Sequence, residues 1–512
     1  MMRPPVLRRS VPAVLAALLL AGDPVTPVGR TAAAQTATAI VGATIIDGNG
    51  GPPLEDGTIV WSGNRISSVG PSAAVAVPEG ARVIDGAGKF VTPGFIDSNV
   101  HLSLYGAGET IVRYFDRNAA LTLEAAQMQL KHGFTTVRDS YGSLLALMEV
   151  RDAIARGDTV GPRMLVAGNI VGWGGPYSIS FSLIRERGLT LFQEQFNDYI
   201  TQGSGEELME MEPEDLRVAI NDYLDLGPDF IKFGGTGHFS NPIMIGFSER
   251  AQRVMVEETH KRGLVAETHS TSPEGLRISV EAGIDLIQHP GVLSSDMSDE
   301  LIEMIVERGI VCAFLSNTVT SKAWQDHLDA QAERMVREAE EEAEAETEGR
   351  DEDARKKTSA ELRAERRARG EGIEIRRRNT ERLIEAGCVT TIGTDNYLGT
   401  APEFRRTPKA ENQAFGMGSV IATEGLVELG MTPMEAIVAV TRNGAIACKM
   451  LDDLGTLEVG KFADILILDA NPVEDIANIR AIGTIIRDGR MVDRDALPYE
   501  RIFSRPGKGH AW

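Results

Sequence analysis

Hydrophobic and polar positions follow two different patterns along this chain, and each pattern predicts its own kind of structure. Short β-branched runs, each followed by a turn signal such as Asp-Gly or Gly-Asn, fill residues 36–90 and recur at 463–489. This pattern is typical of a small β-sandwich. We therefore expect the two termini to build one β domain from residues 35–90 and 451–512, the second part including a C-terminal tail.

Between these two blocks, strand-like apolar runs alternate with helix-like segments such as 249–262 and 273–282. The predicted strands are 90–97, 135–138, 163–167, 230–233, 265–269, 286–289, 311–315 and 390–394. Eight such units predict an α/β fold, a (β/α)8 TIM barrel over residues 91–450. In such a barrel the chemistry lies at the carboxyl ends of the strands.

A highly charged segment, residues 325–382, interrupts this alternation. Glu, Ala, Arg and Lys dominate it, and these residues favour helices. We expect a solvated helical excursion between the seventh and eighth strands. An arm that covers the site or binds a partner is the alternative.

The first 34 residues have the features of an export signal. Three arginines lie within the first nine residues, and the apolar stretch Val11–Ala21 is too short for a permanent membrane span. Ala32–Ala34 then offers small residues for cleavage. We expect a periplasmic or secreted protein with no membrane contact after signal removal.

Composition narrows the classes of partner. The chain has 512 residues, 42% of them hydrophobic, which suffices for one large core and a smaller domain. A net charge of −22 and a pI near 4.9 argue against binding to nucleic acid. A small molecule remains as the expected class of substrate. The three cysteines (Cys312, Cys388 and Cys448) form no CxxC pair, which favours buried free thiols.

Polar residues lie where the predicted strands end. The run 91–101 ends in Asn99 and His101, whose i, i+2 spacing places both side chains on one side of a strand. Later strands contribute Lys232, His269, His289 and Asp395. Three of the chain's eight histidines thus lie at strand ends, which is too regular a pattern for chance.

These residue types favour a metal centre, because imidazole and carboxylate groups suit zinc and related cations. A lysine ammonium is no ligand, but Lys232 carbamylated by CO₂ would act as a carboxylate able to bridge two metals. A lysine paired with an acid is the alternative. A metal would make a bound water more acidic and polarise a carbonyl. Asp395 would be both ligand and general base, passing a proton to the leaving nitrogen.

The motifs around these residues resemble the amidohydrolase superfamily, in its imidazolonepropionase-like and prolidase-like branch. They are residues 91–101, 230–232, 267–269, 287–290 and 392–395, with 441–445 and 455–464 similar to the family's return into its β domain. The resemblance implies a metal-dependent hydrolase. It also implies a metal set of His101, Lys232, His269, His289 and Asp395, with Asp395 as proton shuttle.

Asn99 departs from this pattern, since the family has histidine there. The Asn-X-His motif resembles a subgroup that includes phenylurea hydrolases and molinate hydrolase, which cleave urea or thiocarbamate bonds. An amide oxygen is a weaker ligand than imidazole for such metals. We therefore expect one tight metal position and one weak or empty position, with one or two metals per chain.

We interpret the chain as a hydrolase that uses metal-activated water to cleave a C–N bond in an amide, urea, carbamate or dipeptide-like substrate. An Xaa-Pro-type dipeptidase, a lactonase and a catalytically dead binding protein are the alternatives. We expect Trp173, Tyr177 and His238 to contact substrate, and Arg138 and Asp139 to form an ion pair at the barrel mouth. Barrels of this superfamily often associate, so we expect a homo-oligomer.

Overall fold

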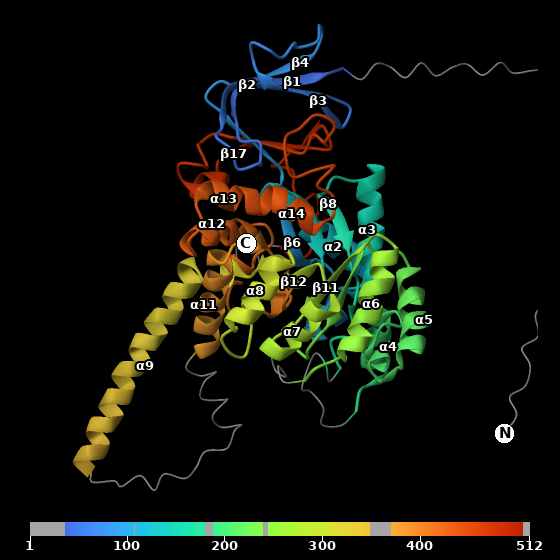
Figure 1. Ribbon diagram of the computed structural model, residues 1–512, viewed down its shortest axis with the longest axis vertical. Coiled ribbons are helices and arrows are strands. Elements are labelled where there is room, and N and C mark those ends of the chain that lie inside the picture. The colour runs from blue at the N-terminus through green and yellow to red at the C-terminus, as the bar shows by residue number, and fades with distance from the viewer. Residues whose placement is uncertain are drawn as a thin grey trace, which may run out of the picture. The chain divides into compact units, whose positions relative to one another are not determined.

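The structure is a computed structural model, and it describes residues 36–106, 108–178, 180, 188–238, 244–348 and 370–504 (Figure 1). The predicted export signal (1–34), residues 349–369 of the charged segment and residues 505–512 lie outside the described residues. Among the helices that are described, none has the length and apolar character needed to cross a membrane.

Strands from both ends of the chain hydrogen-bond in one eight-stranded sheet, ordered β18-β17-β16-β5-β1-β2-β3, with β4 beside β1. They are β1 (Thr38–Ile45), β2 (Leu54–Ser62), β3 (Arg65–Pro71), β4 (Arg82–Asp85), β5 (Phe90–Pro93), β16 (Ile465–Leu468), β17 (Ile482–Arg487) and β18 (Arg490–Met491). Trp61, Val91 and Ile465 belong to its own apolar core. A sandwich of two facing sheets is not confirmed, and the domain boundaries stay a prediction.

The parallel strands form two further sheets, ordered β15-β6-β7-β8 and β14-β13-β12-β11-β10-β9. Their strands are β6 (Phe95–His101), β7 (Phe134–Asp139), β8 (Arg163–Val166), β9 (Ile170–Val171), β10 (Phe230–Gly234), β11 (Val265–His269), β12 (Leu286–Gln288), β13 (Val311–Phe314), β14 (Val389–Ile392) and β15 (Asn396–Tyr397). The α/β class is confirmed. Strand pairing among the described residues does not close the two sheets into one barrel.

The first predicted strand is in fact two strands that divide at Gly94. Strand β5 pairs with β1 and β16 in the sheet of the two termini, whereas β6 pairs with β7. A Cβ at Gly94 would lie only 2.1 Å from Thr135 Oγ1, so any side chain at this position would collide with Thr135 of β7. The apolar run is continuous across Gly94, and periodicity alone therefore did not reveal the division.

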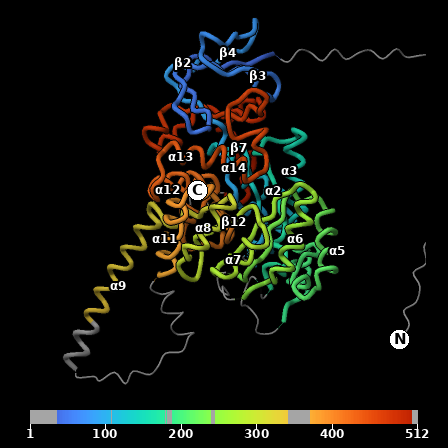
Figure 2. Tube along the Cα trace, viewed as in Figure 1, coloured from blue at the N-terminus to red at the C-terminus, as the bar shows by residue number. Residues whose placement is uncertain are grey.

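Helices alternate with the parallel strands along the chain, as the pattern predicted, and α5 to α8 do so with β10 to β12. Each of the helices α5 to α8 contacts the next one (Figure 2). The helices are α1 (Gly108–Tyr114), α2 (Asn118–Lys131), α3 (Leu144–Arg156), α4 (Leu191–Thr201), α5 (Pro213–Leu224), α6 (Glu249–Lys261), α7 (Pro273–Ala282), α8 (Asp299–Glu307), α9 (Ser321–Glu348), α11 (Glu371–Glu385), α12 (Met417–Glu428), α13 (Pro433–Val438) and α14 (Gly444–Ala447). Ser248 and Ser272 start α6 and α7 by accepting a backbone N–H in the first turn.

The charged segment is helical where it is described, in α9 and α11, and it lies between β13 and β14 as expected. The start of α9 packs on α11: the Arg377 guanidinium lies 4.6 Å from the centre of the Trp324 ring. Gln331 Nε2 also donates to Glu374 Oε1 at 2.9 Å. The function of the segment stays a prediction.

Candidate functional site

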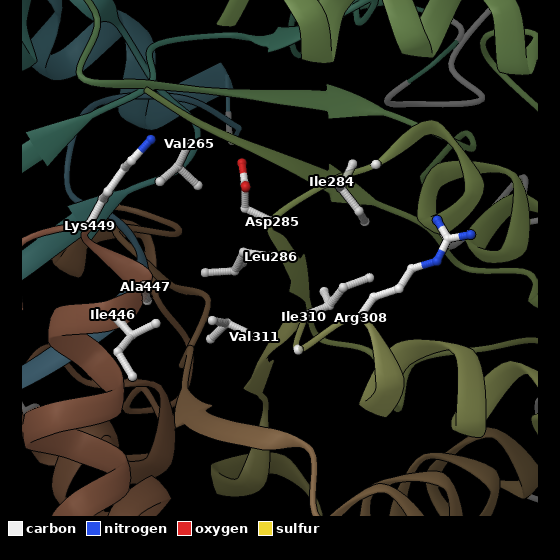
Figure 3. A pocket seen from close by; sticks show the side chains of 12 residues that line it. Val265, Ile284, Asp285, Leu286, Arg308, Ile310, Val311, Ile446, Ala447 and Lys449 are labelled. Carbon is white, nitrogen blue, oxygen red and sulfur yellow. The ribbon is translucent and has the colours of Figure 1, made fainter. Parts of the chain in front are cut away.

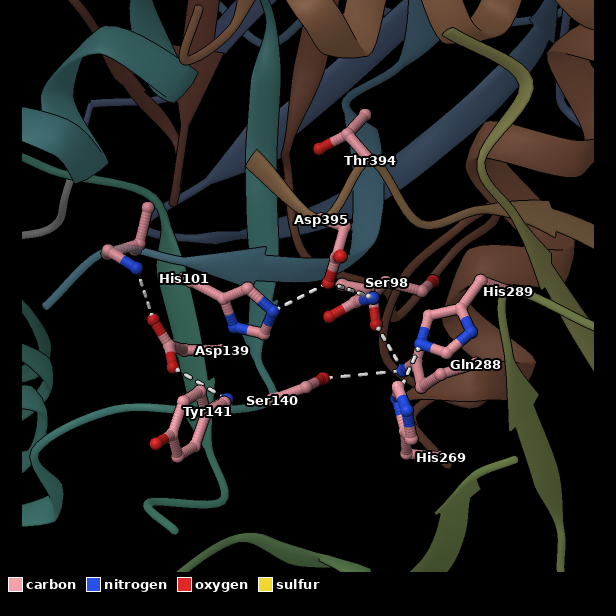
Figure 4. A network of polar contacts seen from close by, with 12 residues as sticks. Ser98, His101, Asp139, Ser140, Tyr141, His269, Gln288, His289, Thr394 and Asp395 are labelled. Atoms are coloured by element: carbon pink, nitrogen blue, oxygen red, sulfur yellow. Dashed lines mark hydrogen bonds and ion pairs between the residues drawn. The ribbon is translucent and has the colours of Figure 1, made fainter. Parts of the chain in front are cut away.

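The carboxylate of Asp395 contacts two polar residues of β6, His101 (Figure 4) and Asn99. His101 Nε2 lies 2.6 Å from Asp395 Oδ1, and Asn99 Nδ2 donates to the same oxygen at 3.1 Å. The backbone N–H of Asp395 donates to Asn99 O at 2.8 Å. The i, i+2 spacing thus brings both side chains to one point, at the end of β14.

His269 and His289 form the second pair. His269 ends β11 and His289 follows β12, and their Nδ1 and Nε2 atoms lie 3.0 Å apart. His289 and Asp395 both have positive φ, 42° and 56°. Residues with side chains adopt this conformation at a cost of about 1–3 kcal/mol, and such strain gathers at functional sites.

Lys232 lies within β10 and is 1% exposed. Burial lowers the pKa of its ammonium, and the nearby carboxylates of Asp395 and Glu267 offset part of that effect. A lowered pKa increases the share of neutral amine, which is the form that reacts with CO₂.

Burial also sets the charge of the other groups. It lowers the pKa of His269 well below its usual value and that of His289 to about 3, so both rings are neutral near pH 7. Burial alone would raise the pKa of Asp395, but His101 and Lys232 bring it well below its usual range. Asp395 is therefore an ionised carboxylate, and the neutral rings of His269 and His289 each keep a nitrogen lone pair that can bind a metal.

The chemical groups of these residues are suitable ligands for a divalent cation. Neutral imidazoles and a carboxylate are the ligands that zinc-like cations prefer. Asn99 Oδ1 is buried and has no hydrogen-bond partner among the described residues, so it is a further oxygen donor. Within the described residues these ligands meet in two groups, Asp395 with His101 and Asn99, and His269 with His289. No three His, Cys, Asp or Glu side chains of the described residues are gathered as in a formed metal site.

A cavity of about 370 Å³ opens beside these residues. It is lined by His101, Tyr105, Gly106, Tyr141, Ile170, Trp173, Lys232, His238, His269, Asp395 and Tyr397, whereas Asn99 and His289 lie outside this lining. The ring of Tyr105 is 4.8 Å from that of Tyr141 and 6.0 Å from that of Tyr397, measured between centroids. One side of the cavity is therefore aromatic.

Two of the three expected substrate contacts line this cavity. Trp173 and His238 lie together in its wall, with ring centroids 5.7 Å apart. Tyr177 is not in the lining; its ring packs on Phe196, with centroids 6.2 Å apart.

Sequence reasoning missed the three tyrosines. Tyr105 follows His101 by four residues, and Tyr141 and Tyr397 each follow a strand-end aspartate by two. An aromatic residue just beyond a polar strand end is the signal that was available. Only the tertiary structure shows that the three rings meet.

The expected ion pair between Arg138 and Asp139 is wrong. Arg138 Nη2 instead lies 2.9 Å from Glu267 Oε2, and both side chains are fully buried. Asp139 accepts the backbone N–H groups of Leu102 and Tyr141 at 2.6 and 3.3 Å. Neighbouring residues of a strand point to opposite sides, so the two side chains have different partners.

A second cavity, of about 400 Å³, lies at the opposite ends of β11, β12 and β13 (Figure 3). Its wall includes the first residue of each strand, Val265, Leu286 and Val311. Its carboxylate, Asp285, already accepts from His260 Nε2 and Ala266 N, each at 2.8 Å. The candidate site therefore lies at the other end of the strands, beside the first cavity.

Comparison with known proteins agrees with this geometry. The family model described as "Amidohydrolase family" matches residues 90–492. The structure of molinate hydrolase is similar, with a TM-score of 0.78 and 29% identity over 92% of this chain and 97% of that one. Phenylurea hydrolase B gives a TM-score of 0.76 and 30% identity, over 91% and 99%.

Sequence comparison adds imidazolonepropionase from Alkaliphilus metalliredigens, 24% identical over 86% of this chain and 90% of the relative. The family model covers well over half of the chain, including every strand that carries a candidate site residue. The chain therefore belongs to the amidohydrolase family and is a hydrolase of carbon–nitrogen bonds.

Proposed function

We propose that this enzyme hydrolyses an aryl-substituted amide, urea or carbamate in the aromatic-walled cavity, with a divalent metal as cofactor. The observation that carries this proposal is the position of Asp395, His101 and His269 in the same lining as Tyr105 and Tyr141. Polar groups suited to C–N hydrolysis thus lie beside rings that suit an aryl group. The similarity to phenylurea hydrolase B supports an aryl-substituted urea within this substrate class.

We propose zinc as the metal, in one tight and one weaker position. The residues that would hold it are His101, Lys232 in carbamylated form, His269, His289 and Asp395, with Asn99 as the weak ligand. When bound, such a cation makes a water molecule more acidic and polarises the substrate carbonyl.

The chain's own residues then handle the proton and the substrate. An oxygen of Asp395 takes a proton from the attacking water and gives it to the nitrogen that leaves, so the carboxylate is restored. The 2.6 Å contact with His101 Nε2 orients that carboxylate. Tyr105, Tyr141 and Trp173 stack on the aryl group and exclude bulk water.

We further propose that the parallel strands correspond to a (β/α)8 barrel over residues 91–450, beside a β domain built by both termini. Strand order and the amidohydrolase relationship support this architecture. An export signal, a periplasmic or secreted location and a homo-oligomer are proposed from the sequence alone.

The test is a panel of an aryl amide, an aryl urea, an aryl carbamate, an Xaa-Pro dipeptide and a lactone, assayed before and after chelation. We expect turnover of the aryl substrates, loss on metal removal and recovery with zinc. Asp395→Asn is expected to lower kcat at least about 100-fold, because it removes a general base. Asp285→Asn, at the other end of the strands, is the matched control and is expected to retain kcat.

Several outcomes would contradict the proposal. Undiminished turnover by metal-free protein would exclude the metal, and an unchanged kcat in Asp395→Asn would exclude the proton shuttle. Turnover of only the dipeptide or the lactone would reassign the substrate. Tight binding of the panel without turnover would favour a catalytically dead binding protein.

A further inference from the structure

A buried glutamine connects the strands that carry the candidate metal ligands. Gln288 is the last residue of β12 and is fully buried. Its Nε2 lies within hydrogen-bond distance of three oxygens: Ser98 O at 3.0 Å and Ser140 Oγ at 3.3 Å (Figure 4), and Glu267 Oε1 at 2.9 Å. These oxygens belong to β6, to the residue after β7 and to β11.

Gln288 and two of its partners, Ser98 and Glu267, each lie one or two residues from a candidate ligand in the sequence. Ser98 precedes Asn99, Gln288 precedes His289, and Glu267 lies two residues before His269 on the same side of β11. One amide group therefore joins the backbone of β6 to the two histidine strands. Because Glu267 Oε1 and Ser98 O can only accept, the amide has one favourable orientation, with Nε2 toward them.

The network continues from Glu267 to Arg138, which packs against Phe230. Glu267 Oε2 pairs with Arg138 Nη2 at 2.9 Å, and the Arg138 guanidinium lies 4.0 Å from the centre of the Phe230 ring. Phe230 is two residues before Lys232 in β10. The network of Gln288, Glu267 and Arg138 thus reaches β6, β10, β11 and β12, the strands that carry or lead to candidate ligands.

Gly393 shows how little space surrounds the amide. A Cβ at Gly393 would lie 3.1 Å from Gln288 Oε1 and 2.8 Å from the Cβ of Asn99. Gly393 is two residues before Asp395. The strand that delivers Asp395 therefore packs directly against Gln288 and Asn99, and a shift of the Gln288 side chain would disturb both.

We propose that Gln288 is a positioning residue that sets the spacing between Asn99 on β6 and the histidine pair, and thereby the metal affinity of the site. This inference rests on the metal role proposed above. Asn99 is a weaker ligand than histidine, so its contribution depends on being held at the correct distance. Groups that orient metal ligands without touching the metal typically change metal affinity by about 10–100-fold.

The test compares Gln288→Met with Gln252→Met. Methionine keeps the length and approximate volume of glutamine but removes its donors. Gln252 is also fully buried and donates from Nε2 to a backbone carbonyl, Phe247 O, at 3.0 Å, at a place outside the candidate site. Both variants therefore lose a buried side-chain hydrogen bond. Zinc affinity is measured by competition with a chelator, together with urea unfolding of the metal-free protein.

We expect zinc affinity to fall about 10–100-fold in Gln288→Met and to stay within twofold of wild type in Gln252→Met. We also expect Gln288→Met to lower kcat more than it changes KM. Should Gln288→Met not fold, Gln288→Asn, which keeps the amide but is one methylene shorter, is expected to weaken zinc binding in the same direction.

Wild-type zinc affinity in a folded Gln288 variant would overturn the positioning role and leave the metal proposal intact. Equal loss of affinity in Gln252→Met would also overturn it, because the effect would then be general. Absence of zinc binding in the wild type would overturn both proposals.

Discussion

Asn99 is the residue that most distinguishes this site. Its Nδ2 donates to Asp395 Oδ1 at 3.1 Å, while its Oδ1 is buried with no hydrogen-bond partner among the described residues. The side chain therefore orients the proposed proton shuttle with one atom and offers a weak oxygen ligand with the other. A histidine at this position would replace the amide with a stronger ligand for zinc-like metals.

Asn99→His is expected to raise the metal content toward two per chain, measured by elemental analysis. Asn99 is fully buried, so the larger ring is also expected to lower the free energy of unfolding by about 1–3 kcal/mol. Asn379→His, at a fully buried position on α11, is the control for overpacking alone. Unchanged metal content and unchanged substrate preference in Asn99→His would show that Asn99 is not a determinant of the site.

At the scale of single elements, helix α2 anchors the last described residues of the chain. The carboxylate of Glu124 accepts the backbone N–H groups of Ile502, Phe503 and Ser504 at 2.7–2.8 Å, and also the Ser504 hydroxyl. Glu124 is 2% exposed. These bonds satisfy a buried charge and fix this segment against α2.

Glu124→Gln is expected to lower the free energy of unfolding by about 1–3 kcal/mol, because an amide nitrogen would face backbone donors. Urea unfolding monitored by circular dichroism measures the change. Glu149→Gln, on the exposed side of α3, is the control and is expected to stay close to wild type. Equal stability of the Glu124 and Glu149 variants would mean that Glu124 does not anchor the segment.

At the scale of the whole molecule, an ion pair links the sheet of the two termini to the parallel strands. Arg163 at the start of β8 contacts Asp464 Oδ2 at 2.5 Å, and their side chains are 14% and 5% exposed. Asp464 Oδ1 also accepts the backbone N–H of Asp488 at 2.6 Å. Asp464 immediately precedes β16, so this ion pair connects β16 of the terminal sheet to β8.

Asp464→Asn is expected to cost about 3–5 kcal/mol of unfolding free energy, since it leaves a largely buried guanidinium without its closest carboxylate. Asp469→Asn is the matched control: its partner is Lys89, and both side chains are well exposed. An exposed pair is worth about 0–1 kcal/mol, so this variant is expected to differ little from wild type. Similar losses in the two variants would contradict the importance of the buried pair.

Local pattern predicted most of the parallel strands and the polar residues at their ends, but not the two-residue strands β9 and β15. The predicted strand 265–269 matches β11 residue for residue, and the i, i+2 spacing of Asn99 and His101 does bring both to Asp395. The pattern missed the division at Gly94, because apolar periodicity does not show which sheet a strand joins. It also paired Arg138 with its neighbour rather than with a residue 129 positions away.

The sequence by itself determined which residues end the parallel strands and which chemical groups they bring, since strand periodicity and residue type are local properties. Only the tertiary structure decided which of those groups meet. It paired His101 with Asp395 and His269 with His289, and it brought Tyr105, Tyr141 and Tyr397 from three separate segments into one cavity lining. Such meetings depend on packing between distant segments, which no local pattern specifies.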